Sequence, residues 1–143
     1  MPARRIIVPG RQRPHQVIIL VFATIAGLTY ALRQAPEPRS LDSYVSPWVL
    51  GIWYTLLLVG GIVGLVGSFY RRNPYRGLLM EWASMIMLTS ALALYATAIF
   101  VSVGATGLGS GGAILAWGVS CAWRWGQIRL DLRALRQTVD GTP

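Results

Sequence analysis

The chain contains no lysine, a single cysteine and a single histidine, and these scarcities exclude several kinds of chemistry. One cysteine cannot form an intramolecular disulfide. One histidine beside it leaves no cluster of the kind that binds zinc or iron. No nucleophile with a positioned base can be named in the sequence. We therefore expect no enzymatic activity, no metal and no cofactor.

Charge of either sign is also scarce. Charged residues make up 13% of the 143 residues, about half of the roughly 25% found in soluble globular domains. Hydrophobic residues make up 54%, and the net charge of +8 comes from arginine alone. This balance is typical of a membrane protein.

Three long stretches of the chain carry no charged residue, at 14–32, 43–70 and 82–123. A charge at the middle of a bilayer costs about 2.5 kcal/mol or more, so such stretches predict membrane crossings. The third stretch is long enough for two crossings, and five glycines between residues 104 and 112 supply a turn between them. We therefore predict an all-α polytopic membrane protein. Its four transmembrane helices are placed at about 16–32, 47–69, 78–103 and 108–127.

The arginines predict how these helices are oriented. All but two of the 13 lie in the N-terminal segment of residues 1–15, in the loop before the third helix, or around the C-terminal tail of residues 128–143. The positive-inside rule therefore places both termini of the transmembrane domain, residues 16–127, in the cytoplasm. A cleaved signal peptide is the alternative interpretation of the first helix, and it would leave the topology of the rest unchanged.

Small residues recur on one face of two predicted helices. The face in the second helix consists of Gly60, Gly64 and Gly67. The face in the fourth helix consists of Gly112, Ala116 and Ser120. Small residues let helix backbones approach closely, which favours helix association in lipid. Packing inside one four-helix bundle and contacts between subunits of a homo-oligomer both fit these faces, and the sequence leaves the choice open.

Glu81 is the only acidic residue inside a predicted transmembrane helix. Ionisable groups at such depth usually pair with one another, and Arg124 lies at a similar depth if the last two helices form an antiparallel hairpin. We predict an ion pair between Glu81 and Arg124 that fixes the register of the two helices. A proton or ion pathway through Glu81 is the weaker alternative, because the predicted helices contain few other polar groups.

The C-terminal tail has the pattern of a basic amphipathic helix. Its basic face carries Arg129, Arg133 and Arg136, and its apolar face carries Ile128, Leu132 and Leu135. Such a helix could continue the fourth span, pair with a second copy or lie on anionic lipid headgroups, and we favour the headgroups. A cytoplasmic protein is a further expected partner. Nucleic acid is not, because the arginines flank membrane helices, where topology already requires them.

Two segments resemble parts of known proteins. Residues 79–83 (LMEWA) and 121–132 (CAWRWGQIRLDL) resemble small four-span membrane proteins encoded by phages and prophages of high-GC actinobacteria, some of which are regarded as holin-like. The resemblance covers mainly the second half of the chain and carries over no functional residue. It implies a phage origin and the cytoplasmic membrane of a bacterial host.

These observations lead to an expected function. We expect a phage-encoded, holin-like integral membrane protein that oligomerises in the cytoplasmic membrane and permeabilises it. The alternative is a non-lytic interaction protein, either a superinfection-exclusion factor or an anchor for a cytoplasmic partner.

Overall fold

The structure, a computed structural model, describes residues 14–32, 45–70 and 72–140. For Pro14, Pro74 and residues 134–140 it describes the backbone alone. All regular elements within this part of the chain are helical, which confirms the predicted all-α class. The long helices are α1 (Pro14–Ala31), α3 (Pro47–Phe69), α4 (Pro74–Val103) and α5 (Leu108–Asp140).

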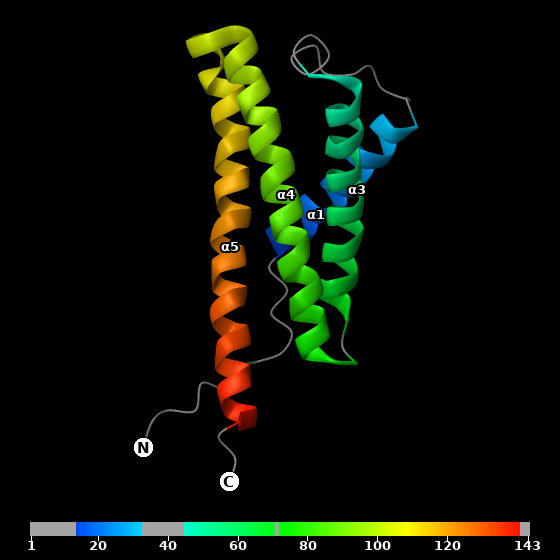
Figure 1. Ribbon diagram of the computed structural model, residues 1–143, viewed down its shortest axis with the longest axis vertical. Coiled ribbons are helices and arrows are strands. Elements are labelled where there is room, and N and C mark those ends of the chain that lie inside the picture. Colours follow the sequence, from blue (N-terminus) through cyan, green and yellow to red (C-terminus); the bar gives the residue numbers. More distant parts are fainter. Residues whose placement is uncertain (1–13, 33–44, 71, 141–143) are drawn as a thin grey trace.

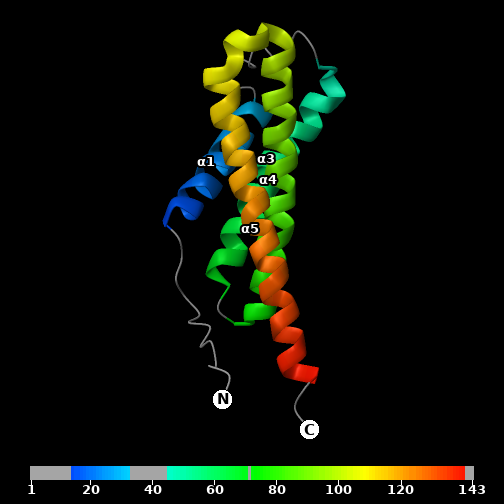
Figure 2. The same cartoon turned by 90° about the vertical axis from the view of Figure 1, so that its left-hand side faces the viewer.

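The helices form an elongated bundle in which α1 stands apart in direction. α3, α4 and α5 follow the long axis of the molecule, whereas α1 crosses it obliquely (Figures 1 and 2). α3 packs against both α1 and α4, and α4 packs against α5. The turn between α3 and α4 lies at the same end as the end of α5, and the turn between α4 and α5 lies at the other end.

The start of α4 is set by a local capping signal. The Asn73 side chain accepts hydrogen bonds from the backbone N–H groups of Tyr75 and Arg76, at 3.1 and 3.3 Å. Asparagine is a favoured N-cap, and the proline that follows it suits a first turn, where its missing N–H is not needed. α4 therefore begins about one turn earlier than the predicted residue 78, whereas α3 has the predicted bounds.

The reversal between α4 and α5 takes only the short 3-10 helix Gly104–Gly107. Gly104 has a φ of 60°, a conformation that glycine adopts readily and other residues rarely do. α5 then continues without a break to Asp140, beyond the predicted boundary at residue 127. The tail is thus a continuation of the fourth helix, the first of the three alternatives, and not a separate helix lying across its end.

The core is apolar and includes two hydrogen bonds that tie α3 to α4. The indole N–H of Trp53 donates to the carbonyl oxygen of Ala91 at 3.0 Å. The hydroxyl of Ser84 donates to the carbonyl oxygen of Gly60 at 2.6 Å. Both donors are buried, so each is satisfied by a backbone group of the neighbouring helix, as buried polar groups require.

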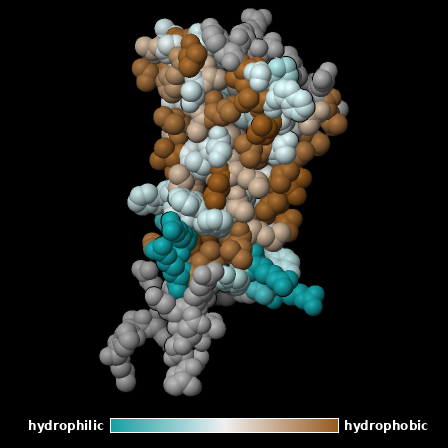
Figure 3. Space-filling model, in the orientation of Figure 1, coloured by the Kyte–Doolittle hydropathy of each residue, from teal (hydrophilic) through white to brown (hydrophobic). Residues whose placement is uncertain are grey.

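The outward faces of the helices are also apolar. Large hydrophobic side chains are exposed along every helix, among them Ile18, Ile25, Ile62, Ile86 and Val119. Hydrophilic side chains gather near one end of the molecule, where the described arginines of α4 and α5 lie (Figure 3). An apolar surface of this extent is characteristic of membrane contact.

Two helical stretches are long and apolar enough to cross a membrane. One is Pro47–Phe69, and the other is Tyr75–Arg133, which comprises most of α4, the turn and most of α5. α1 contributes a shorter apolar stretch, His15–Ala31. Length and composition thus support a membrane protein.

α1 and α3 approach so closely that side chains are excluded where they cross. A Cβ atom on Gly27 would lie 2.5 Å from the backbone nitrogen of Leu58. A Cβ atom on Gly61 would overlap Thr24. Backbone atoms of a packed helix cannot move aside cheaply, so this crossing depends on glycine in both helices.

We predict that Gly27→Ala destabilises the protein. The added methyl group forces the two helices apart, and overpacking of this kind costs about 1 to 3 kcal/mol. Gly51→Ala is the matched control, because a Cβ atom on Gly51 of α3 would meet nothing within 4 Å. The control should keep or raise stability, since alanine is the better helix former. Thermal unfolding in mild detergent compares the two variants, and equal midpoints would contradict the close crossing.

Candidate functional site

Glu81 is buried near the arginine-rich end of the bundle. It lies on α4, about two turns from the start of that helix, and is 7% exposed. A buried carboxylate without partners would cost several kcal/mol, so its neighbours decide whether the position is tolerated.

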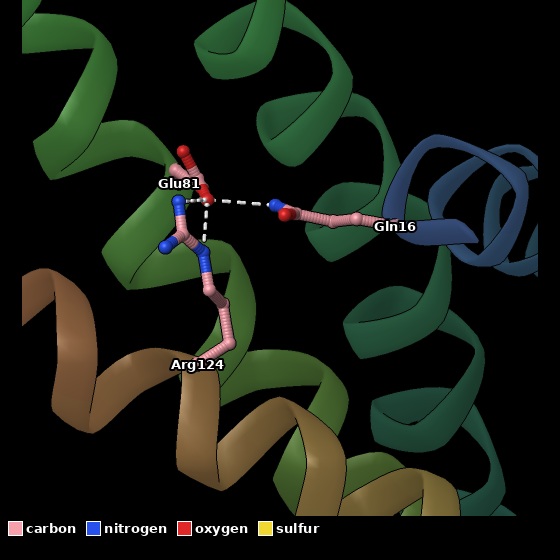
Figure 4. A network of polar contacts seen from close by, with 3 residues as sticks. All are labelled: Gln16, Glu81 and Arg124. Carbon is pink, nitrogen blue, oxygen red and sulfur yellow. Dashed lines mark hydrogen bonds and ion pairs between the residues drawn. The ribbon is translucent and has the colours of Figure 1, made fainter. Parts of the chain in front are cut away.

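Arg124 of α5 is the charged partner of Glu81. Its Nη2 lies 2.8 Å from Oε1 of Glu81, and its Nε donates a hydrogen bond to the same oxygen at 2.9 Å (Figure 4). The side chains of Arg124 and Glu81 are 22% and 10% exposed. The two residues predicted to pair therefore do lie together, at the level where the antiparallel hairpin brings α4 and α5 into contact.

Gln16 of α1 is a third member of this site, and the sequence analysis missed it. Its Nε2 donates a hydrogen bond to Oε1 of Glu81 at 2.7 Å. One signal was available, because Gln16 is a polar residue at the arginine-rich end of the first apolar stretch. Its meeting with Glu81 depends on the oblique path of α1, which hydrophobic periodicity does not give. The carboxylate thus connects three helices.

The hydroxyl groups in the apolar part of the bundle do not extend this site. Each of five hydroxyls donates to the carbonyl oxygen four residues earlier in its own helix: Thr24, Thr55, Thr89, Ser90 and Thr97. Such bonds satisfy the hydroxyls locally. Glu81, Arg124 and Gln16 therefore form a structural connection, and these hydroxyls offer no support for a proton pathway from it.

Two tryptophans lie next to the ion pair in sequence and pack against each other. The rings of Trp82 and Trp125 have centroids 6.3 Å apart, and the guanidinium of Arg129 lies 6.0 Å from the Trp125 ring centroid. Tryptophan and arginine are common where a membrane protein meets the headgroup region. This layer therefore marks a suitable depth for the membrane boundary.

The tail residues fall into three groups. Ile128 is fully buried in the core, so its assignment to a surface tail was wrong; α5 runs on without a break, which keeps this residue inside the bundle. Leu132 is partly buried beside the core, whereas Arg129 and Arg133 are exposed. The side chains of Leu135 and Arg136 lie outside the described residues.

The small-residue face of α3 is used inside the chain. Gly60, Gly64 and Gly67 are all buried, and the atoms closest to their added Cβ positions belong mainly to α4. At Gly67 the nearest is the backbone nitrogen of Glu81, at 2.8 Å. The small-residue face of α3 therefore packs inside the bundle, which is the first of the two alternatives given for it.

The small-residue face of α5 lies on the outside. Ala116 and Ser120 are exposed, and a Cβ atom added to Gly112 would meet nothing within 4 Å. Internal packing therefore does not account for Gly112, Ala116 and Ser120. Contact between subunits of a homo-oligomer, the second alternative, stays a prediction for this face.

No protein-family model, curated protein or solved structure matches this chain. Within the part of the chain that the structure describes, no three histidine, cysteine, aspartate or glutamate side chains come together as a metal site.

We predict that Arg124→Glu lowers stability and that adding Glu81→Arg partly restores it. The single variant places two carboxylates side by side. Breaking a fully buried ion pair costs about 3 to 5 kcal/mol. We expect a smaller loss of stability in this protein, because the Arg124 side chain is 22% exposed. Arg133→Glu makes the same charge change at an exposed position of α5 and should stay within about 0.5 kcal/mol of the original protein. Unfolding in detergent compares the stability of all these variants. If the double variant is no more stable than Arg124→Glu, the ion pair does not stabilise the bundle.

Proposed function

We propose that this chain is a phage-encoded, holin-like protein that crosses the bacterial cytoplasmic membrane four times, self-associates there and permeabilises it. The observation that carries the proposal is the uncovered small-residue face of α5, Gly112, Ala116 and Ser120, on the outside of an apolar helix bundle.

The course of α1 supports four crossings. α1 begins at the level of Glu81, which Gln16 contacts, and it reaches Trp53 at its other end, where the ring of Tyr30 lies 5.4 Å away. Trp53 in turn donates a hydrogen bond to Ala91, near the middle of α4, so α1 runs from the level of Glu81 to that of Ala91. An apolar helix of 18 residues that packs along α3 in this way fits a fourth pass through the apolar layer.

The distribution of charge supports the orientation. The exposed arginines of the described residues, Arg72, Arg76, Arg129 and Arg133, belong to the end where α4 starts and α5 leaves the bundle. The short helix Gly104–Gly107 at the opposite end carries no charge. The positive-inside rule then places the arginine-rich end in the cytoplasm.

The α5 face supports self-association. A lipid tail packs poorly against a helix face that lacks large side chains, whereas a second small-residue face allows close backbone contact. A second copy of this chain offers such a face with matching geometry, as in two-fold symmetric contacts. The equivalent face of α3 is already covered by α4, so it is not available for this purpose.

A specific observation also favours the second candidate, a non-lytic anchor. α5 has 33 residues and is about 50 Å long, whereas the apolar core of a bilayer is about 30 Å thick. The helix therefore extends past the bundle at the arginine-rich end, with Arg129 and Arg133 exposed. A cytoplasmic protein with an acidic surface would suit this extension.

We predict that Ala116→Leu weakens self-association without destabilising the single chain. Ala116 is exposed, so the larger side chain extends away from its own bundle and separates two copies joined through this face. Ala93→Leu makes the same change at an exposed position of α4 and should leave association unchanged. Crosslinking in membranes, followed by size analysis in detergent, compares the variants. If both associate like the original chain, α5 is not the interface.

Inducible expression in a bacterial host separates the two candidates. We expect a delayed, abrupt loss of membrane potential, with lysis only when a cytoplasmic endolysin is co-expressed. Deleting residues 134–143 keeps the buried Ile128 in place and should change at most the timing of that loss. Ala116→Leu should delay or prevent it, and Ala93→Leu should not. Continued growth with an intact potential would contradict permeabilisation and favour the anchor.

A further inference from the structure

An apolar groove runs between α1 and α5, the two long helices that scarcely touch. Its volume is about 270 Å³, and all four long helices line it. α1 contributes Phe22 and Ala26, α3 contributes Trp53, and α5 contributes Ile114 and Trp117. An apolar cavity of about 150 Å³ already holds a benzene-sized guest, so this groove has room for a hydrocarbon chain.

A smaller polar pocket adjoins the groove at the arginine-rich end. It has a volume of about 60 Å³, and its lining includes His15, Gln16, Arg124 and Gln127. Ile19 lines both the groove and this pocket, so the two lie next to each other along the seam between α1 and α5. The seam as a whole is amphipathic, with a long apolar part and a short polar part.

The polar pocket is suited to an anionic group. A guanidinium has five N–H donors, and Arg124 uses its Nε and Nη2 towards Glu81. Glu81 does not line the pocket, but its Oε1 lies 2.8 Å from Arg124 Nη2, so the guanidinium faces the pocket as the cationic half of an ion pair. Arginine recognises phosphate well, because its donors are fixed in a planar fork.

We propose that this seam binds one anionic phospholipid, with its phosphate against Arg124 and His15 and one acyl chain in the groove. The lipid would enter from the side, between α1 and α5, where the rings of Phe22 and Trp117 meet edge to face with centroids 6.2 Å apart and would have to separate. The depth is appropriate, because the pocket lies in the same layer as the exposed Trp123, where headgroups meet the apolar core. The proposal rests on the membrane placement given above but not on permeabilisation.

The test uses the full chain in neutral detergent, stripped of lipid and titrated with phosphatidylglycerol or with phosphatidylcholine of the same acyl chains. Native mass spectrometry counts the bound molecules. We expect one phosphatidylglycerol per chain, bound at least tenfold more tightly than phosphatidylcholine. Ala26→Phe should weaken this binding at least tenfold, because the ring occupies the groove. Ala93→Phe, an exposed position outside the groove, is the matched control and should bind as the original chain does.

A second variant tests the headgroup end and keeps the test decisive if Ala26→Phe does not fold. His15 is exposed, so His15→Glu should fold normally, place a carboxylate at the polar pocket and reduce the preference for phosphatidylglycerol at least tenfold. Equal affinities for the two lipids would overturn the proposal, and so would unchanged binding by a folded Ala26→Phe or an unchanged lipid preference in His15→Glu. Two further assays separate this proposal from the proposed function. If the lipid test fails, the membrane-potential assay still tests permeabilisation independently. If a carbonate wash releases the chain from the membrane fraction, the chain is not an integral membrane protein, and both proposals fail.

Discussion

A carboxylate inside an apolar bundle has to accept hydrogen bonds from the protein, because little water is available to solvate it. Glu81 meets this demand through Arg124 of α5 and Gln16 of α1, so one acidic group sets the level at which three helices meet. α4 and α5 are held in register there, and the start of α1 is held at the same level. One turn further along α4, the hydroxyl of Ser84 donates a hydrogen bond to the carbonyl oxygen of Gly60 and so connects α4 to α3, the remaining long helix. The buried polar groups thus specify the relative positions of helices whose apolar surfaces would tolerate sliding.

Small residues divide into two groups with opposite positions in the fold. Those of α3 face inward and allow α1 and α4 to approach at backbone distance, as Gly61 and Gly67 illustrate. In α5, Gly111 and Gly118 are buried against α4, whereas the predicted face of Gly112, Ala116 and Ser120 is not packed inside the bundle. The oblique path of α1 turns this helix away from α5, and the amphipathic seam lies between the two helices. The two proposed external features, a helix face for a second copy and a seam for a lipid, meet at Ser120, which belongs to the first and lines the polar pocket of the second.

Much of the fold follows from one-dimensional patterns. Charge-free stretches and prolines locate the helices closely, and the bounds of α3 agree with those predicted. The pairing of Glu81 with Arg124 was predictable, because a short glycine-rich turn forces an antiparallel hairpin and so equal depth. The contact between Gln16 and Glu81 was not predictable, because the angle at which α1 crosses the bundle depends on packing and leaves no periodic signal in the sequence. The burial of Ile128 was missed for a related reason: the amphipathic pattern of the tail looks the same whether the helix lies on a membrane or continues along its own bundle. The two small-residue faces were equivalent in sequence, and only their neighbours distinguish them.

We propose that the bundle crosses the membrane with its arginine-rich end in the cytoplasm, and labelling of single cysteines measures this orientation. The chain has one cysteine, so Cys121→Ser gives a clean background for Thr106→Cys in the short helix and Asp131→Cys on α5, both at exposed positions. A membrane-impermeant maleimide is applied to spheroplasts before the membrane potential changes. The account predicts labelling at position 106 in intact spheroplasts and at position 131 only after lysis. Labelling at position 131 in intact spheroplasts, or protection of position 106, would contradict it.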